Sequence, residues 1–461
     1  MFKGMRVAVI GLGRTGYDTA TILKSLGAMP FAYERKSEAD PNILWAAQHL
    51  RNLSVPVYTN WSGEIDLLNI DLVVPSPGVP CDAPVLQDAL AKGVPILSEI
   101  EIAYRIAKCP IIAITGTNGK STTTTLIAQM IKANGKQAFI CGNIAGVETE
   151  MTLIHAAAQA RESDFLVAEI SSFQLEWIEQ FKPKVGVLTV IQPDHMNRYN
   201  NDFALYARTK SKLFANQDPN DFAVLNADDP NTPKYVTQCE GQKLMFTLKD
   251  SPTDTTGYFR DDVLFINWGG KEIGLLPRDE ILLQGKHNIA NALAASLAAL
   301  ALDVEVWAIR SVLRRFKGLQ HRMELVGTVN GVRYINNSMC TNPEAAAASV
   351  DSLDTPIVVI AGGEDKGLDF EPYVEVLARR AKHLVLIGAH ADAIEEAARA
   401  KGLNAIQRAG SMMEAVRLCS EIAEVGDTVI LAPGCAAFDM FVDFKARGKQ
   451  FRQGVKKLPR D

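Results

Sequence analysis

The sequence of 461 residues contains no long apolar run. No stretch approaches the ~18 apolar residues that a membrane-spanning helix needs, and the opening MFKGMRVAVIGLG lacks the cleavage region of a signal peptide. These absences argue against a helical membrane protein and a secreted one. We therefore expect a cytoplasmic protein with no membrane span.

The sequence is also poor in features that would hold zinc or attract nucleic acid. Its 7 cysteines are scattered and never spaced as C-x-x-C, which favours reduced thiols over disulfides or a zinc site. The net charge of -5, without a long basic run, offers no attraction to a polyanion. We expect neither a disulfide framework nor a nucleic-acid partner.

What the sequence does contain is three successive series of strands and helices. Apolar runs that predict strands occur at 6–11, 30–34, 71–76 and 95–99, then at 110–115, 164–170, 185–190 and 221–226, and finally at 332–336, 356–362, 383–388 and 427–433. Helical patterns such as 16–27 and 288–302 separate them, which is typical of parallel sheets. Segment 257–276 alternates around Gly269-Gly270 and predicts an inserted β-hairpin. We predict an α/β fold with three domains, 1–96, 97–305 and 306–461.

The first glycine-rich motif is GLGRTG at 11–16, directly after the predicted strand MRVAVI. Glu34 ends the next strand. Strand, G-x-G-x-x-G and a later acidic residue form the fingerprint of a dinucleotide-binding unit. Taken alone, the motif therefore indicates an NAD(P)-dependent oxidoreductase. The loop SPGVP at 76–80 follows another strand, where doubly wound sheets place ligands.

A second glycine-rich motif, ITGTNGKSTTTT at 114–125, predicts a phosphate-binding loop. Gly116 and Gly119 let backbone N–H groups close around phosphate oxygens, Lys120 can reach the β- and γ-phosphates, and Ser121 can bind Mg²⁺. The loop is shorter than the usual G-x-x-x-x-G-K-[ST], so it matches the generic motif only in part.

Two titratable residues follow predicted strands of the same series. Glu169 ends the strand FLVAE, and His195 follows VGVLTV in the triplet PDH. The carboxyl ends of parallel strands meet at the edge where the phosphate loop also lies, so these side chains could hold magnesium ions there. Lys210, in YARTKSKLF, has the local pattern of an exposed helical lysine.

Together these motifs resemble the Mur ligases, and among them most closely the members that add D-glutamate. The matching segments follow the family order: GTNGKST (116–122), AEISSFQLE (168–176), PDHMNRY (193–199), GKHNIANALAA (285–295), GLQHR (318–322), AGGEDKGLDF (361–370) and APGCAAFDMF (432–441), with GLGRTG and SPGV near the N-terminus. The resemblance covers essentially the whole chain. It implies a Rossmann-like N-terminal domain for a UDP-sugar, a central P-loop ATPase-like domain with a parallel sheet, and a Rossmann-like C-terminal domain that closes over ATP and brings the amino acid.

The resemblance implies ATP-dependent amide formation in the synthesis of a cell-wall precursor. The carboxylate of UDP-N-acetylmuramoyl-L-alanine would attack the γ-phosphate of ATP to give an acyl phosphate, and the amine of D-glutamate would then displace phosphate. Positioning and charge stabilisation supply most of the catalysis in such transfers. We expect an ADP-forming ligase that acts as a monomer.

The family pattern also implies roles for individual residues around ATP. Lys120 would bind the γ-phosphate, Ser121 and Glu169 one Mg²⁺ and His195 a second, while Lys210 aligns with a lysine that CO₂ carbamylates to support a metal. The expected catalytic residues are Lys120, Glu169, His195 and Lys210, and the expected metal ligands are Ser121, Glu169, His195 and Lys210. Residues expected at the nucleotide are Gly116, Thr117, Asn118, Gly119, Lys120, Ser121, Thr122, His287, Asn288, Asn291, Arg322 and Asn337. Asn291 would lie near the adenine, and Arg322 would reach the phosphates only after closure.

The substrate residues implied by the resemblance fall into three groups. Around the uridine diphosphate we expect Arg14, Thr15, Glu34, Arg35, Lys36 and Ser76. At the reacting end of the sugar nucleotide we expect Asn143, Ser171 and Gln174, which local capping would also explain. At the amino acid we expect Thr341, Lys366 and Phe444. The first glycine loop is then the holder of UDP rather than of NAD.

Four positions depart from the family pattern. Asn337 replaces the usual aspartate and Met339 the usual lysine in YINNSMCTNP at 334–343. Asparagine can still hydrogen-bond a ribose hydroxyl, whereas methionine cannot pair with a carboxylate. Ala437 stands where the D-glutamate ligases carry a serine, and Val190 where an asparagine is common before PDH. These changes leave open another amino acid, such as L-glutamate or a different D-amino acid.

Three other functions remain open from the sequence. A folylpolyglutamate-type ligase is disfavoured because that type generally lacks the amino-terminal UDP domain. An oxidoreductase would leave the second glycine loop, Glu169, His195 and Lys210 without a role. A non-catalytic nucleotide-binding regulator would be favoured by the loss of Lys120, Glu169 or His195, and all three residues are present.

Overall fold

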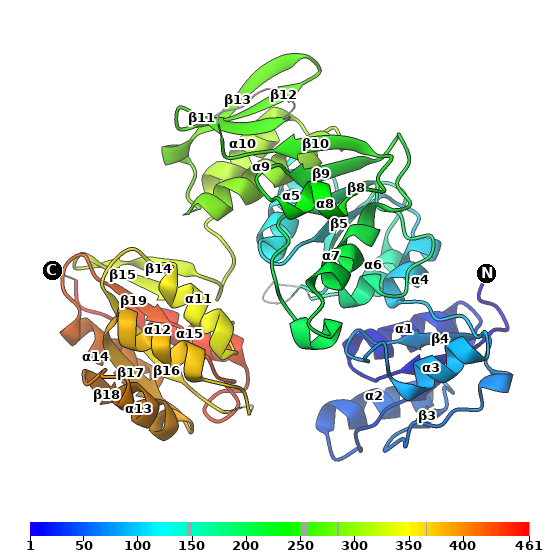
Figure 1. Ribbon diagram of the computed structural model, residues 1–461, viewed down its shortest axis with the longest axis horizontal. Helices are drawn as coiled ribbons and strands as arrows, with labels where there is room; N and C mark the ends of the chain where they lie inside the picture. The colour runs from blue at the N-terminus through cyan, green and yellow to red at the C-terminus, as the bar shows by residue number, and fades with distance from the viewer. Residues whose placement is uncertain (145–149, 250–255, 284, 366, 461) are drawn as a thin grey trace. The chain divides into compact units, whose positions relative to one another are not determined.

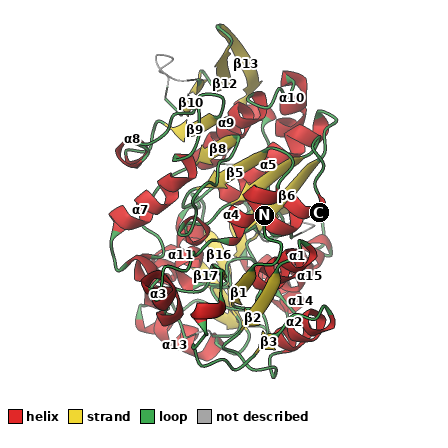
Figure 2. Ribbon diagram, turned by 90° about the vertical axis from the view of Figure 1, so that its right-hand side faces the viewer, coloured by secondary structure: helices red, strands yellow, loops and turns green. Residues whose placement is uncertain are grey.

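The computed structural model describes residues 1–144, 150–249, 256–283, 285–365 and 367–460, and it contains three β-sheets (Figure 1). The chain forms two compact units, one from Met1 to Phe316 and one from Lys317 to the C-terminus. The first unit holds two of the sheets and the second unit holds the third. Helices flank the strands of each sheet (Figure 2), which confirms the predicted α/β class.

The first sheet consists of four parallel strands in the order β3-β2-β1-β4. Its strands are β1 (Arg6–Ile10), β2 (Met29–Tyr33), β3 (Val57–Tyr58) and β4 (Leu72–Pro75), with α1 (Arg14–Ser25), α2 (Pro41–Asn52), η1 (Leu67–Asn69) and α3 (Pro84–Ala91). The strand predicted at 95–99 is wrong, because only an isolated bridge joins Ile96 to Val73 and helix α4 (Glu99–Ile106) begins at Glu99. Glu99 and Glu101 in its first turn favour the helix through its dipole.

The second sheet has nine strands in the order β13-β12-β11-β10-β9-β8-β5-β7-β6. Its strands are β5 (Ile111–Thr115), β6 (Ala138–Gly142), β7 (Phe165–Glu169), β8 (Val185–Leu188), β9 (Phe222–Asn226), β10 (Gln242–Phe246), β11 (Gly257–Arg260), β12 (Val263–Trp268) and β13 (Lys271–Pro277). The helices of this part are α5 (Lys120–Ala133), α6 (Leu153–Gln159), η2 (Phe173–Leu175), η3 (Met196–Tyr199), α7 (Phe203–Ser211), η4 (Lys212–Phe214), α8 (Asn231–Tyr235), η5 (Arg278–Glu280), α9 (Lys286–Leu300) and α10 (Val306–Arg315).

The antiparallel strands β11, β12 and β13 extend the edge of this sheet. The hairpin predicted around Gly269-Gly270 is confirmed: both glycines have positive φ, of 56° and 76°, and join β12 to β13. A second tight turn, at Asp261-Asp262, joins β11 to β12. Segment 257–276 therefore extends the sheet that the parallel strands form and is not a separate insertion.

The third sheet has the order β14-β15-β19-β16-β17-β18, with only the β14–β15 pair antiparallel among its described strands. Its strands are β14 (Glu324–Val329), β15 (Val332–Asn336), β16 (Ile357–Gly362), β17 (Ala381–Ile387), β18 (Ile406–Arg408) and β19 (Thr428–Leu431). Its helices are α11 (Pro343–Asp351), α12 (Glu371–Arg380), α13 (Ala391–Ala400), α14 (Met412–Ile422) and α15 (Phe444–Lys456).

One hydrophobic core joins the first two sheets. Val7 and Val9 of β1 belong to the same buried cluster as Ile111 and Ala113 of β5. Helix α6 packs against both α1 and α4, while α5, α9 and α10 pack on one another. This shared core explains why the first two sheets form one compact unit.

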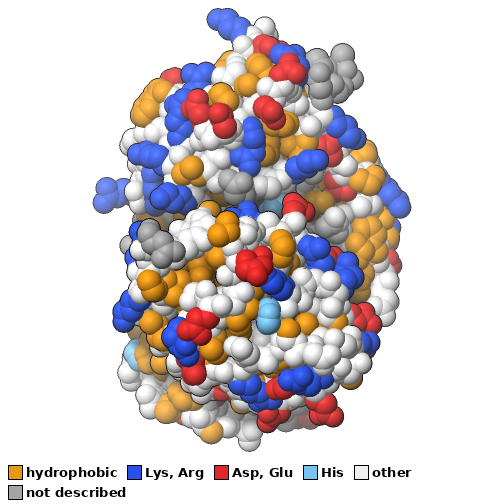
Figure 3. Space-filling view, turned by 90° about the vertical axis from the view of Figure 1, so that its left-hand side faces the viewer, with side chains coloured by type: hydrophobic (Ala, Val, Ile, Leu, Met, Phe, Trp, Pro, Cys, Tyr) orange, Lys and Arg blue, Asp and Glu red, His pale blue; other side chains and the backbone are white. Residues whose placement is uncertain are grey.

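Two further features concern the surface. Within the described ranges, no helix combines the length and apolarity needed to cross a bilayer. On the face drawn in Figure 3, basic and acidic side chains are interspersed among apolar ones, without an extended field of one sign. This distribution is consistent with the small net charge of -5.

Candidate functional site

The second glycine loop lies between β5 and α5, as the sequence predicts. Gly116 and Gly119 have φ of 142° and 87°, and a Cβ on Gly119 would lie 2.3 Å from Asn291 Oδ1. Both conformations favour glycine. The loop therefore brings a bare backbone to the N-terminus of α5, which is suited to binding phosphate oxygens.

The neighbouring strand holds this loop in place. Thr117 N donates to Val190 O at 2.7 Å, and Thr189 Oγ1 donates to Asn118 O at 2.5 Å. The contact from residue 190 uses its backbone carbonyl, so the valine found there instead of asparagine preserves it. Thr122 lies in the first turn of α5, half-buried behind the loop.

Two lysines meet at the start of the loop. Lys120 Nζ donates to Gly116 O at 3.0 Å and to Thr117 O at 2.9 Å, while Lys210 Nζ donates to Gly116 O at 2.9 Å. Lys210 is only 2% exposed, so its appearance as an exposed helical lysine was misleading. Burial, and then the charge of Lys120, lower the pKa of Lys210 to about 7, against the opposing effect of Asp194 and Glu169.

A carboxylate lies against the first turn of α5. Ser121 Oγ donates to Glu169 Oε2 at 2.5 Å, and both side chains are buried. Glu169 is the last residue of β7, which pairs with β5 in parallel. The sheet register therefore places an acid and a hydroxyl next to the lysines, as the strand-end argument predicts.

His195 is more exposed than the other predicted catalytic residues. It precedes η3 in a left-handed conformation with φ of 53°, and its side chain is 53% exposed. Its Nε2 lies 3.6 Å from Asp194 Oδ2, and its ring centroid lies 4.9 Å from that of Phe173. The imidazole is thus turned toward solvent beside the loop that follows β8.

The predicted adenine side is formed by the start of α9. Asn291 is 6% exposed, and its Nδ2 donates to Asn288 Oδ1 at 3.2 Å. His287, one turn earlier, is exposed. The structure therefore brings Asn291 against Gly119, while His287 and Asn288 lie at the helix N-terminus.

The first glycine loop is held by Glu34 and Ser76. Glu34 accepts from Leu12 N at 2.7 Å and from Lys36 N at 2.9 Å, and Ser76 Oγ donates to Gly11 O at 3.0 Å. Glu34 thus holds the loop backbone with one carboxylate oxygen and the backbone of Lys36 with the other. A Cβ on Gly16 would lie 1.8 Å from Gly11 O, so only glycine fits where α1 approaches β1.

The cationic residues near this loop lie at the surface. Arg14 pairs with Glu150 at 3.0 Å and Lys36 with Asp40 at 3.0 Å, and Arg35 is exposed. Thr15 is half-buried in the first turn of α1. The predicted uridine diphosphate residues therefore gather at the carboxyl end of the first sheet.

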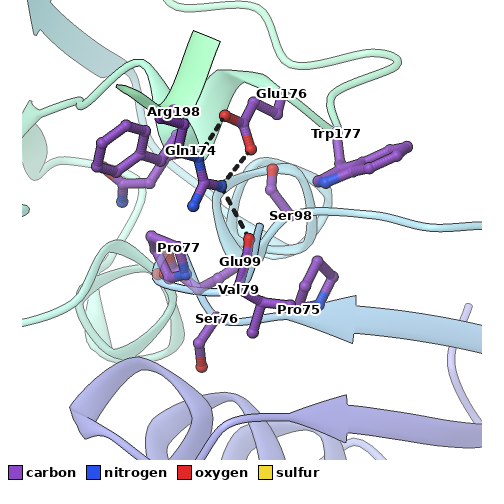
Figure 4. Close-up of a pocket in the computed structure, with 11 residues that line it drawn as sticks. Pro75, Ser76, Pro77, Val79, Ser98, Glu99, Gln174, Glu176, Trp177 and Arg198 are labelled. Atoms are coloured by element: carbon purple, nitrogen blue, oxygen red, sulfur yellow. Dashed lines mark hydrogen bonds and ion pairs between the residues drawn. The ribbon is translucent and has the colours of Figure 1, made fainter. Parts of the chain in front are cut away.

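A pocket lies between this region and the central sheet (Figure 4). Its lining includes Ser76 and Gln174, two of the predicted substrate residues. Gln174 Oε1 accepts from Ser171 N at 3.0 Å and from Ser171 Oγ at 3.1 Å, so local capping does occupy this pair, as the sequence allowed. Asn143 is exposed after β6, and its N–H donates to Glu169 O at 2.8 Å.

Three buried polar atoms around this pocket have no hydrogen-bond partner among the described residues. They are Ser98 Oγ, Glu99 Oε2 and Trp177 Nε1. Burial raises the pKa of Glu99 to about 7, although its Oε1 accepts from Ile154 N at 2.6 Å. Unpartnered polar atoms at a pocket wall favour a polar occupant, water included.

In the second compact unit, Phe444, one of the residues predicted to meet the amino acid, lies against Ser338. Ser338 Oγ donates to Phe444 O at 2.7 Å, and Arg447 Nη2 donates to Ser338 O at 3.0 Å and to Cys435 O at 3.1 Å. Thr341 lies half-buried in the same loop. Lys366 lies outside the described residues.

Two departures from the family pattern are accommodated in this unit. Asn337 Oδ1 accepts from Met323 N at 3.1 Å and its Nδ2 donates to Ser349 Oγ at 2.8 Å, so both polar atoms of the asparagine amide have a partner. Arg322 Nη2 contacts Met339 Sδ at 3.3 Å, and Arg322 Nε is buried without a partner in the described part of the chain. Arg322 therefore lies beside the methionine that stands in place of the family lysine.

Comparison with known proteins places this geometry in a family. Family models match the chain at residues 5–98 (Mur ligase MurD-like, N-terminal domain), 114–299 (Mur ligase middle domain) and 321–435 (Mur ligase, glutamate ligase domain). A curated UDP-N-acetylmuramoylalanine--D-glutamate ligase of Thermoanaerobacter pseudethanolicus is 40% identical over 460 residues, 99% of both chains. The chain belongs to the Mur ligase family.

A further curated relative and two solved structures are also similar to this chain. The enzyme of the same name from Pelotomaculum thermopropionicum is 39% identical over 457 residues, 99% of this chain and 98% of that one. Among solved structures, the UDP-N-acetylmuramate-alanine ligase MurC of Thermotoga maritima has a TM-score of 0.55 at 19% identity, covering 98% of this chain and 99% of that one. E. coli FolC, in complex with DHPP and ADP, has a TM-score of 0.54 at 16% identity, over 78% and 92%. The structural matches show the shared fold, and the predicted three-domain Mur ligase architecture is confirmed.

The phosphate loop of this Mur ligase offers oxygen donors that fit Mg²⁺. Within the described part, no three His, Cys, Asp or Glu side chains gather as a metal site. The buried Ser121–Glu169 pair nevertheless supplies two hard oxygen donors at the phosphate loop. Mg²⁺ is commonly held by one or two carboxylates together with substrate phosphates, so this pair fits the ion.

Several residues of the site were not singled out from the sequence. Arg198 and Glu176 form a buried ion pair at the pocket. Thr189 donates a hydrogen bond to the phosphate loop. Arg447, which contacts Ser338 and Cys435, is 0% exposed. Arg198 and Glu176 do lie inside the matched segments PDHMNRY and AEISSFQLE. Their position within these motifs was the available signal, but only the structure shows what they contact.

Proposed function

We propose that this Mur ligase joins D-glutamate to UDP-N-acetylmuramoyl-L-alanine, with conversion of ATP to ADP and phosphate. The observation that carries the proposal is full-length similarity, at 40% identity over 99% of the chain, to a ligase named for D-glutamate. The phosphate loop with Lys120, Ser121 and Glu169 supplies the corresponding chemistry. The reaction belongs to peptidoglycan precursor synthesis.

The phosphate loop would bind ATP through its backbone N–H groups, Gly116 to Thr122. Lys120 now donates to two backbone oxygens of the loop, and it would turn toward the γ-phosphate when ATP is bound. Asn291, packed on Gly119, with His287 and Asn288, would hold the nucleoside end. From the second compact unit, Arg322 and Asn337 would meet the phosphates and the ribose.

The acyl transfer would proceed in two steps. A carboxylate oxygen of the L-alanine residue attacks the γ-phosphorus, and the bond to the ADP oxygen breaks. The amine of D-glutamate then attacks the acyl carbon, loses a proton, and inorganic phosphate leaves. The positive charges of Lys120 and Arg322 would stabilise the charge that spreads over the transferring phosphoryl group.

We propose the metal residues that the family pattern implies. Bound Mg²⁺, at two sites, would neutralise phosphate charge and orient the phosphoryl group. Ser121 and Glu169 would hold one ion and His195 the second. Lys210, once carbamylated, would present a carboxylate toward the metal side of the loop. Its burial supports this role, because an amine with a pKa of about 7 is partly neutral and open to CO₂ at physiological pH.

The substrates would be divided among three domains, 1–96, 97–305 and 306–461. The first would hold the uridine diphosphate through Arg14, Thr15, Glu34, Arg35, Lys36 and Ser76, and the sugar's reacting end would meet Asn143, Ser171 and Gln174. The third would bring D-glutamate on Thr341, Lys366 and Phe444. We further propose a cytoplasmic monomer with no nucleic-acid partner.

The test is phosphate release from ATP with Mg²⁺ and UDP-N-acetylmuramoyl-L-alanine against a panel of D- and L-amino acids. We expect phosphate with D-glutamate alone. Turnover with L-glutamate instead would overturn the stereochemical part and would point to Met339 and Ala437. NADH oxidation without ATP use would overturn the whole assignment. Lys120→Ala should abolish turnover, and full turnover would remove that residue from its role.

A further inference from the structure

Arg198 joins two parts of the first compact unit that are far apart in sequence. Its Nε donates to Glu176 Oε1 at 3.0 Å, and its Nη2 donates to Glu176 Oε2 at 2.6 Å and to Val79 O at 2.8 Å (Figure 4). The side chains of Arg198 and Glu176 are 12% and 6% exposed. This is a forked, buried ion pair with a third bond into the loop that follows β4.

Two of the three segments in this contact carry a residue that we place at the sugar nucleotide: Val79 is in the same loop as Ser76, and Glu176 follows Gln174. Arg198, Glu176 and Val79 all line the pocket of Figure 4. A single guanidinium therefore connects three segments around one pocket.

Arg198 also reaches His195 indirectly. Its guanidinium carbon lies 4.4 Å from the ring centroid of Phe173, and Phe173 in turn packs on the His195 ring at 4.9 Å. The Phe173 ring therefore contacts both the Arg198 guanidinium and the half-exposed His195 imidazole. Tyr199 OH adds a bond of 3.2 Å to Glu176 Oε1, so the acid is held from two sides.

We propose that Arg198 is a positioning residue for the sugar nucleotide. By holding Val79 O and the Glu176 carboxylate together, it sets the 76–80 loop against residues 171–176 and so shapes the pocket before the substrate arrives. Lysine cannot reproduce this arrangement, because its single ammonium group lacks the planar fork of donors. The inference deepens the proposed function and rests on it, since the substrate concerned is the one assigned there.

The experiment compares Arg198→Lys with wild type in the full-length chain. We expect the KM for UDP-N-acetylmuramoyl-L-alanine to rise about tenfold, as for loss of one charged hydrogen bond, with the KM for ATP within about twofold. Arg260→Lys is the matched control, since Arg260 also pairs with a carboxylate, Glu272, at 2.9 Å but lies on the β11–β13 edge. It should leave both constants unchanged.

A purely structural role would move the two constants together. Equal rises in both KM values, or a sugar-nucleotide KM within about twofold of wild type, would overturn the inference. Should Arg198→Lys not fold, Glu176→Gln keeps the shape of the acid and should show the same split. Turnover of Arg198→Ala should be restored by added guanidinium and not by ammonium at equal concentration, and equal rescue by both would contradict the fork.

Calorimetric binding of UDP-N-acetylmuramoyl-L-alanine separates this inference from the proposed function. Active wild type whose affinity is matched by Arg198→Lys overturns the inference alone. A wild-type chain that neither binds nor converts the sugar nucleotide overturns the proposed function, and this inference with it. Binding weakened about tenfold in Arg198→Lys supports the positioning role without reference to turnover.

Discussion

Lys120 and Lys210 donate to the same acceptor, the backbone oxygen of Gly116, at 3.0 and 2.9 Å. Burial disfavours the charge on Lys210, and repulsion from the Lys120 ammonium group on the same carbonyl adds to this effect. The pKa of Lys210 falls to about 7 as a result. Lys210 is therefore the buried lysine beside the phosphate loop whose charge is readily lost.

Lys210→Ala should be inactive, because the proposed carbamate is lost together with the amine. Short-chain carboxylates such as formate or acetate should restore part of the turnover by filling the space with an anion. Phosphate release measured with and without added carboxylate checks this. Lys234→Ala, an exposed lysine of the same compact unit, is the control. Activity of Lys210→Ala equal to that of wild type would refute the carbamate.

Gly119→Ala should weaken ATP binding, because its Cβ would lie 2.3 Å from Asn291 Oδ1 and displace that side chain. The matched control is Gly135→Ala, whose φ of +82° is similar to the +87° of Gly119 but whose Cβ would meet nothing within 4 Å. Both changes carry the left-handed backbone cost of roughly 1–2 kcal/mol. We expect the KM for ATP to rise about tenfold more in Gly119→Ala, and equal effects would remove Asn291 from the adenine side.

Glu169→Gln should lower kcat by about 100-fold or more, because the metal and phosphate charges lose their carboxylate. The glutamine keeps an acceptor for Ser121 Oγ, so folding should change little. The readout is kcat as a function of Mg²⁺ concentration. A variant with wild-type kcat and an unchanged Mg²⁺ requirement would exclude Glu169 as a metal residue.

Much of the fold follows from local pattern. The runs RVAVI, IIAIT and FLVAE have the strand length and apolarity of buried parallel strands, and each forms one. The exception, 95–99, fails because Ser98 and Glu99 start a helix there. Helix α10 packs on α5 and lies in the first compact unit, a tertiary preference that its amphipathic sequence does not reveal.

The site was less predictable than the strands. The motif around Gly116 identifies a phosphate loop because its chemistry depends on the backbone. The burial of Lys210, in contrast, arises from packing of α7 onto that loop, which no local pattern encodes. Arg198 likewise depends on a bond to Val79, which is 119 residues away in sequence. Contacts of this kind emerge only when the sheets are assembled.

Glu99→Gln should change how stability depends on pH. Burial raises the pKa of Glu99 from 4.5 to about 7, so folding favours the protonated acid. That stabilisation is fully present below pH 4.5 and is lost as pH rises through about 7. Between pH 5 and pH 8 wild type should lose roughly 2.5 kcal/mol relative to the variant. Urea unfolding followed by tryptophan fluorescence checks this, and parallel pH profiles would contradict it.

The most direct measurement of the central claim is mass spectrometry of the sugar nucleotide after incubation with ATP, Mg²⁺ and either D- or L-glutamate. The account predicts a product heavier by one glutamate residue with the D-enantiomer, formed in equal amount to ADP and absent without ATP. A product formed only with L-glutamate, or none with either enantiomer while ATP is still consumed, would contradict it.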